Sequence, residues 1–158
     1  MMLMILNTTS AVINELTNAE SNISILYEKI AQQYPQIREF FLMYSNENRK
    51  NKIIIQRAYY AKNKDDLDAE SAFKKGLDTS KYSLKKTFPI SSTLDDIFQI
   101  AVESEKTTIQ LYSDTAKLCA RIMPYLHDIL QTLIEKRGKR IIKIEKRRKK
   151  LTVQSNDN

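Results

Sequence analysis

The chain has 158 residues, of which 42% are hydrophobic, and carries a formal net charge of +7 with only 2 glycines, 3 prolines and 1 cysteine. This length suffices for one domain with a hydrophobic core, and the scarcity of glycine and proline favours long helices. One cysteine excludes an intramolecular disulfide, one histidine excludes metal sites that need two imidazoles, and no stretch approaches the ~20 apolar residues of a membrane-spanning helix. We therefore expect a cytoplasmic protein without a transmembrane segment.

Apolar residues recur at helical spacing in two segments of the N-terminal half. The first segment covers about 9–33 and the second about 37–61, and Pro35 interrupts the pattern between them. Two segments of the C-terminal half, about 94–118 and about 126–151, show the same spacing. The sequence therefore predicts four long helices.

The starts of the third and fourth helices carry further signals. Thr93 and Asp96 have the spacing of a capping box, with Asp in place of the usual Glu. Pro124 marks the break before the fourth helix, and His127 follows it in the first predicted turn, which favours a capping or surface role. Cys119 has no local base and lies at no helix start, so we expect a buried structural thiol.

The linker between the second and third helices, residues 62–92, is too long for a simple turn. Within it, "DAESAFKKGLD" (68–78) predicts a short helix that ends at Gly76, and no part of the chain alternates as a strand does. Short turns inside each half and the long crossover between them predict two antiparallel helical hairpins. The fold class is thus an all-α four-helix bundle over residues 1–151, with a disordered tail at 152–158.

An internal repeat supports the two-hairpin arrangement. The segment "AESNISILYEKIA" (19–31) aligns with "SEKTTIQLYSDTA" (104–116) at an offset of 85 residues. Glu20 then pairs with Glu105, and Tyr27 with Tyr112. Matches in helices that have equivalent places indicate a duplication.

The second and fourth helices carry charged residues on faces predicted to be buried. In "ENRK" (47–50), the apolar phase through Tyr44 places Glu47 and Lys50 on the inner face. In the fourth helix, the phase through Leu133 continues to Arg137 and Arg140. A register two residues earlier, which selects Glu135 and Gly138, stays open.

Together these features resemble the rubrerythrin branch of the ferritin-like superfamily. In that family the first and third helices each carry a metal-binding glutamate seven residues before a tyrosine. Glu20 precedes Tyr27, and Glu105 precedes Tyr112, by the same seven residues. The second and fourth helices each carry a Glu-x-x-His motif, and the site holds two irons that react with peroxide or oxygen. The resemblance implies a ferritin-like bundle and allows a homodimer.

The chain departs from the family pattern at the histidine positions. Lys50 stands where the second helix should carry histidine, and Arg137 and Arg140 stand at the Glu and His places of the fourth. Because buried charges persist only when they are paired, we expect three carboxylates and three cations to form a metal-free cluster. This predicted cluster comprises Glu20, Glu47, Lys50, Glu105, Arg137 and Arg140, with Tyr27 and Tyr112 beside the carboxylates. No cofactor is expected.

Two alternatives stay open for the centre of the bundle. A di-iron or mixed-metal site with altered ligands, Glu20, Glu47 and Glu105 joined by Glu103 or Glu135, would retain oxidoreductase activity. Alternatively, Glu20 or Glu47 lies at the edge of an apolar stripe, with its carboxylate in water.

The end of the fourth helix is strongly basic. Residues 136–150, "KRGKRIIKIEKRRKK", hold ten of the 26 Lys and Arg residues and one acidic residue. Such asymmetry favours contact with nucleic acid or an anionic surface, through Lys146, Arg147, Arg148, Lys149 and Lys150. The alternative is a solvated helix end whose charge suits the helix dipole. The leading interpretation of the whole sequence is a non-catalytic structural or interaction module.

Overall fold

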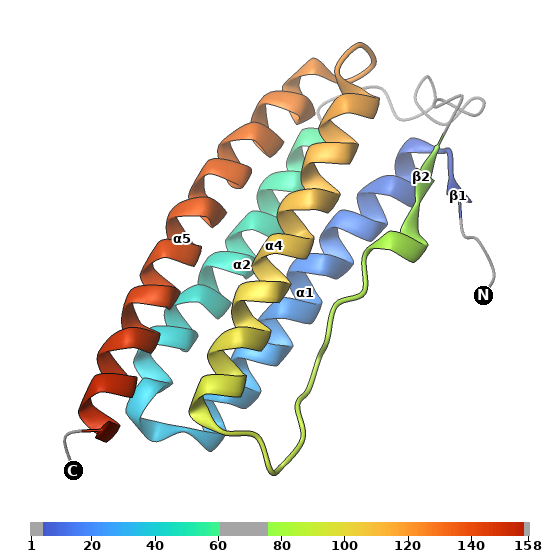
Figure 1. Ribbon diagram of the computed structural model, residues 1–158. Helices are drawn as coiled ribbons and strands as arrows, with labels where there is room; N and C mark the ends of the chain where they lie inside the picture. Colours follow the sequence, from blue (N-terminus) through green and yellow to red (C-terminus); the bar gives the residue numbers. More distant parts are fainter. Residues whose placement is uncertain (1–4, 61–75, 157–158) are drawn as a thin grey trace.

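The computed structural model describes residues 5–60 and 76–156, and these residues form an all-α protein (Figure 1). Four long helices lie side by side: α1 (Thr9–Gln33), α2 (Arg38–Tyr60), α4 (Leu94–Cys119) and α5 (Pro124–Asn156). Helix α1 runs antiparallel to α2, and α4 runs antiparallel to α5, whereas α2 and α4 run in the same direction. The prediction of an all-α protein with four long helices is therefore confirmed for the described residues.

The helix boundaries follow the predicted sequence signals closely. The Thr8 hydroxyl accepts a hydrogen bond from the Ala11 amide at the start of α1. At the start of α4, Thr93 and Asp96 form the predicted capping box, with each side chain accepting from the backbone amide of the other. A short 3₁₀ turn, η1 (Pro35–Ile37), joins α1 to α2, because proline suits the first position of a helical turn.

A small strand pair differs from the sequence prediction. Strands β1 (Ile5–Leu6) and β2 (Leu77–Asp78) pair antiparallel, and the 3₁₀ turn η2 (Thr79–Lys81) follows β2. Two residues are too few to show alternation, so the pattern could not reveal these strands. The predicted short helix at 68–76 falls mostly in 61–75, outside the described residues.

The end of α5 also differs from the prediction. The helix continues to Asn156, so most of the segment 152–158 that we expected to be a disordered tail is helical. The backbone carries on through Thr152, whose hydroxyl donates to the Arg148 carbonyl one turn earlier. No proline or glycine follows Gly138 to end the helix.

A polar layer divides the hydrophobic core into two parts. One part surrounds Leu16, Ile55 and Leu133, and the other surrounds Ile23 and Phe98. Between these two parts, each of the four helices contributes buried polar or charged side chains to the interior: Glu20 from α1, Asn48 and Asn51 from α2, Glu105 from α4, and Arg137 and Arg140 from α5. Among the described residues, none of the helices has an apolar stretch long enough to cross a membrane.

Candidate functional site

Two buried glutamates face each other across the bundle, each held by a tyrosine of the opposite helix. Glu20 of α1 and Glu105 of α4 are both completely buried. The Tyr27 hydroxyl donates to Glu105 Oε1 at 2.6 Å, and the Tyr112 hydroxyl donates to Glu20 Oε1. The repeat that pairs these residues in the sequence therefore corresponds to a reciprocal pair of hydrogen bonds between α1 and α4.

Arg137 of α5 joins the two glutamates. Its Nη2 donates to Glu20 Oε1 at 2.5 Å and its Nη1 donates to Glu105 Oε2 at 2.6 Å. The side chain is only 1% exposed, and its guanidinium carbon lies 5.5 Å from the centre of the Tyr112 ring. One planar cation thus bridges two carboxylates, a geometry for which guanidinium is well suited.

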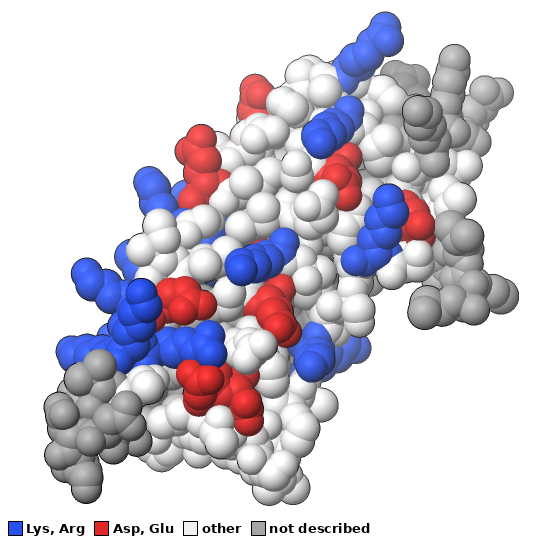
Figure 2. All heavy atoms as spheres, in the orientation of Figure 1, with Lys and Arg blue, Asp and Glu red and all other residues white. Residues whose placement is uncertain are grey.

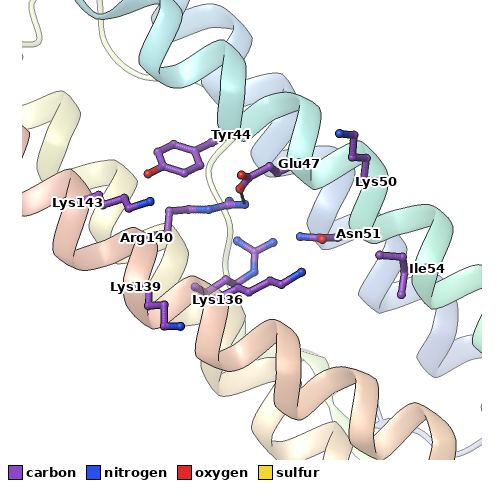
Figure 3. A pocket seen from close by; sticks show the side chains of 10 residues that line it. Tyr44, Glu47, Lys50, Asn51, Ile54, Lys136, Lys139, Arg140 and Lys143 are labelled. Carbon is purple, nitrogen blue, oxygen red and sulfur yellow. Dashed lines mark hydrogen bonds and ion pairs between the residues drawn. The ribbon is translucent and has the colours of Figure 1, made fainter.

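Arg140, one turn further along α5, connects the buried pair to α2 (Figure 3). Its Nη1 donates to Glu105 Oε1 at 2.9 Å and to Asn48 Oδ1 at 2.7 Å. Its Nη2 donates to Glu47 Oε2 at 3.0 Å, and its guanidinium lies 4.6 Å from the centre of the Tyr44 ring. We call Glu20, Glu47, Glu105, Arg137 and Arg140 the charge cluster.

The charges of the buried part cancel formally, since Glu20 and Glu105 face Arg137 and Arg140. Burial alone would raise the pKa of Glu105, but the two arginines and the Tyr27 hydroxyl lower it below its usual value. Burial would likewise lower the pKa values of the arginines, but Glu105 raises both of them. Glu105 and both guanidinium groups are therefore charged at neutral pH.

The second helix contributes differently from the prediction. Lys50 is exposed and forms no ion pair with a member of the charge cluster. Glu47 lies at the edge of the cluster, with a side chain that is 49% exposed. Instead, Asn48 and Asn51 point inward. The placement of Lys50 in the buried cluster is thus wrong, and Glu47 is a rim residue.

The reason is the phase of α2. The buried residues that lie along it repeat at alternating spacings of three and four: Phe41, Tyr44, Asn48, Asn51, Ile55 and Ala58. When the buried face is drawn through Ile55 rather than through Ile54, which is 37% exposed, the heptad places the two asparagines on that face. The heptad was the signal that could have identified Asn48.

On the fourth helix, the structure places Arg137 and Arg140 inside, in the register that continues from Leu133. The alternative register is excluded, since Glu135 is exposed and Gly138 has no neighbour within 4 Å of an added Cβ. Glu103 of α4 is also exposed and accepts a hydrogen bond from Gln99.

The five basic residues predicted to bind anions do not share one face of α5. Arg148 forms two hydrogen bonds with Asp95 of α4, at 2.7 and 2.8 Å. Arg147 lies over the Phe40 ring of α2, at 4.8 Å from its centre. Lys146, Lys149 and Lys150 are exposed.

The single cysteine and histidine lie apart from the charge cluster. Cys119 is buried, as predicted, and burial raises the pKa of its thiol to about 11. His127 is half-buried rather than a simple surface residue, because Nδ1 lies 2.9 Å from the Ala116 carbonyl and donates to it across the α4–α5 pair. Both side chains are therefore hydrogen-bonded to the last turn of α4.

The donor set does not fit a pair of metal ions. In residues 5–60 and 76–156, no group of three or more His, Cys, Asp or Glu side chains is placed to hold a metal ion. Three of the four carboxylate oxygens of Glu20 and Glu105 already accept from arginine or tyrosine, which leaves Glu20 Oε2. The groups that these oxygens contact include the guanidinium groups of Arg137 and Arg140, which have no lone pair to donate to a metal ion.

Comparison with known proteins adds no family to this description. No protein-family model matches the chain, and a search of curated protein sequences gives no match.

Proposed function

We propose that this chain is a non-catalytic, ferritin-like bundle related to the rubrerythrins, and that it acts as a structural or interaction module. In this proposal the arginines of α5 replace the metal ions as counter-charges of the central carboxylates. The observation that carries it is the position of Arg137, whose two terminal nitrogens lie 2.5 and 2.6 Å from the two buried glutamates.

The arrangement of the helices supports the ferritin-like part of the proposal. Two antiparallel hairpins with parallel second and third long helices have the connectivity of that fold. The residues at the family's first- and third-helix metal positions, Glu20 and Glu105, are buried at the same level of the bundle and share Arg137. Each glutamate accepts a hydrogen bond from the tyrosine of the other helix, and this reciprocal arrangement is consistent with an ancestral duplication.

The protonation states of the cluster support a non-catalytic role. A general base needs a pKa near the working pH, whereas the arginines lower that of Glu105. Burial and the neighbouring glutamates raise the pKa values of Tyr27 and Tyr112 well above their usual range, so both phenols stay protonated. Glu105 and the two arginines therefore stay charged at neutral pH, and the two phenols stay neutral.

An oxidoreductase with an altered metal site is a weaker candidate. Its additional ligands would have to come from Glu47, Glu103 or Glu135, and all three are exposed. Bringing any of them to Glu20 would require the arginines to leave buried carboxylates, which is unfavourable.

Metal analysis tests the proposal. The protein is purified from cells supplemented with iron and manganese, and its metal content and absorption spectrum are measured beside a rubrerythrin treated identically. We expect well below one metal ion per chain and no absorption of an oxo-bridged di-iron centre. Two ions per chain would contradict the proposal.

Binding of an anionic partner by the end of α5 is a second candidate function. Lys and Arg side chains gather over the part of the molecule nearest the C-terminus (Figure 2), and Lys146, Lys149 and Lys150 are exposed there. Removal of residues 146–150 should then abolish binding to RNA or anionic vesicles, and binding by the full chain should weaken steeply with salt. Salt-insensitive binding would argue against it.

A further inference from the structure

A cavity of about 430 Å³ opens between α2 and α5, directly outside the charge cluster (Figure 3). We call it the α2–α5 groove. Its lining combines cations with a few polar and apolar groups: Tyr44, Glu47, Lys50, Asn51, Ile54, Lys136, Arg137, Lys139, Arg140 and Lys143. Six of these ten residues are cationic and one is acidic.

The lysines of the groove have no acidic partner among the residues that the structure describes. Lys50, Lys136, Lys139 and Lys143 form no ion pair or hydrogen bond within the described residues. The only carboxylate in the lining, that of Glu47, accepts from Arg140. The groove therefore carries a surplus of positive charge in a concave site, where low-dielectric walls strengthen the attraction of anions.

Two buried donors in the lining lack acceptors. The Tyr44 hydroxyl and Arg137 Nε have no hydrogen-bond partner in the described part of the chain, although Tyr44 is 3% and Arg137 1% exposed. Figure 3 shows Tyr44 reaching from α2 toward α5, with Lys143 and Arg140 beside it. Because an unsatisfied buried donor is costly, a ligand that supplies acceptor oxygens here gains more than it would at an open surface.

We propose that the α2–α5 groove is a binding site for a small anion that carries two or more phosphate groups. Such an anion offers many acceptor oxygens and several charges for the four free ammonium groups, and the cavity lies within the size range of small-molecule sites. The proposal deepens the interaction role proposed above and rests on it, since Arg137 and Arg140 must stay in the lining as cations. Free diphosphates and phosphorylated lipid headgroups both offer these acceptor oxygens and negative charges.

Calorimetric titration of the intact chain with sodium diphosphate tests this site, with ADP and phosphoinositide vesicles as further arms. The groove variant is Lys139→Ala/Lys143→Ala. Its matched control is Lys106→Ala/Lys117→Ala, which removes the same charge from exposed positions of α4 outside the groove. Tyr44→Phe removes only the unpartnered hydroxyl.

We expect the groove variant to weaken diphosphate binding by at least about tenfold and the control to weaken it by no more than about twofold, since ammonium–phosphate contacts act at short range. Tyr44→Phe should weaken binding without lowering the melting temperature, because its hydroxyl has no partner to lose. Binding of ADP that is tighter than that of diphosphate indicates that the natural ligand is a free nucleotide. Binding only to the phosphoinositide vesicles indicates that it is a lipid headgroup.

Two results would overturn the proposal: absence of binding to all three probes at millimolar concentration, or equal losses of affinity in the groove and control variants. Metal content is measured on the same samples. A metal-loaded chain would contradict the proposed function, whereas a metal-free chain that binds no phosphate contradicts only the groove.

Discussion

Replacing Arg137 by methionine removes the cation that joins the two buried glutamates. The variant loses two charge-assisted hydrogen bonds, to Glu20 Oε1 and to Glu105 Oε2. Glu105 keeps Arg140 as a partner, whereas Glu20 keeps only the Tyr112 hydroxyl. The variant therefore places an uncompensated negative charge at a completely buried position.

The expected cost is large because this pair is buried. Breaking a buried ion pair by removing one partner costs about 3–5 kcal/mol. For a chain of this size, each kcal/mol lowers the melting temperature by about 2–4 °C, so we expect a decrease of about 6–20 °C.

Two double variants separate charge from packing. Glu20→Gln/Arg137→Met neutralises the carboxylate left unpaired and keeps an acceptor for Tyr112, so it should recover at least half of the lost stability. Glu47→Gln/Arg137→Met removes a half-exposed carboxylate that does not contact Arg137, and it should recover none. Urea titrations followed by circular dichroism measure all four proteins. A cost below about 1 kcal/mol for the single variant, or equal stability of the two doubles, would refute the reasoning.

Three further predictions concern the tyrosines beside the charge cluster, the carboxylate of Glu105 and the two glycines. Tyr27→Phe and Tyr112→Phe should each cost about 1.5–3 kcal/mol and agree with each other, because each removes one hydrogen bond to a buried carboxylate; unequal losses in urea titrations would contradict the reciprocal arrangement. The pKa of Glu105 is lowered from its ordinary value of 4.5, so its contribution to stability is complete above that pH and is lost as the pH falls through the folded-state value. The difference in unfolding free energy between the wild type and Glu105→Gln should accordingly narrow below pH 4.5, and a constant difference would show that the group does not titrate in this way. Gly138→Ala should stabilise the chain by about 0.5–1 kcal/mol, since nothing obstructs the new methyl in α5. Gly76→Ala should destabilise it, since the backbone has a φ of +66° and the Cβ would lie 2.6 Å from Ile5 Cγ2; opposite signs in thermal melts are the expected result.

The helices and the four buried members of the charge cluster could be predicted because their signals are local or repeated. Helix starts depend on caps and prolines, so Thr93 and Pro124 identified two of them. The offset of 85 residues identified Glu20 and Glu105 together, since duplicated helices place equivalent residues at equivalent depths. The arginines followed from continuing a clear apolar phase beyond Leu133.

The contribution of α2 could not be predicted as well, because its helix is amphipathic over a wide arc. The inner face of α2 holds two asparagines, and of two consecutive isoleucines one, Ile55, is buried while the other, Ile54, is exposed. Consecutive residues of a helix lie about 100° apart, so the sequence allowed two choices of the buried face, one through Ile54 and one through Ile55. The choice of the first placed Glu47 and Lys50 inside. Their true positions depend on packing against α1 and α5, which a single helix pattern does not contain.

The groove was not predicted for a different reason. Lys136, Lys139 and Lys143 are ordinary surface lysines in the sequence, and only the approach of α2 places them around Tyr44 and Lys50. Likewise, β1 and β2 lie more than 70 residues apart and are two residues long, so tertiary contact rather than local pattern determines them.

Anomalous diffraction from crystals of the protein, produced in iron- and manganese-supplemented cells, tests the central claim most directly. Data collected at the absorption edges of both metals show what lies between Glu20 and Glu105. The account predicts the guanidinium of Arg137 within hydrogen-bonding distance of both carboxylates, and no anomalous peak between them. An anomalous peak at that position, with Arg137 turned away from the glutamates, would contradict it.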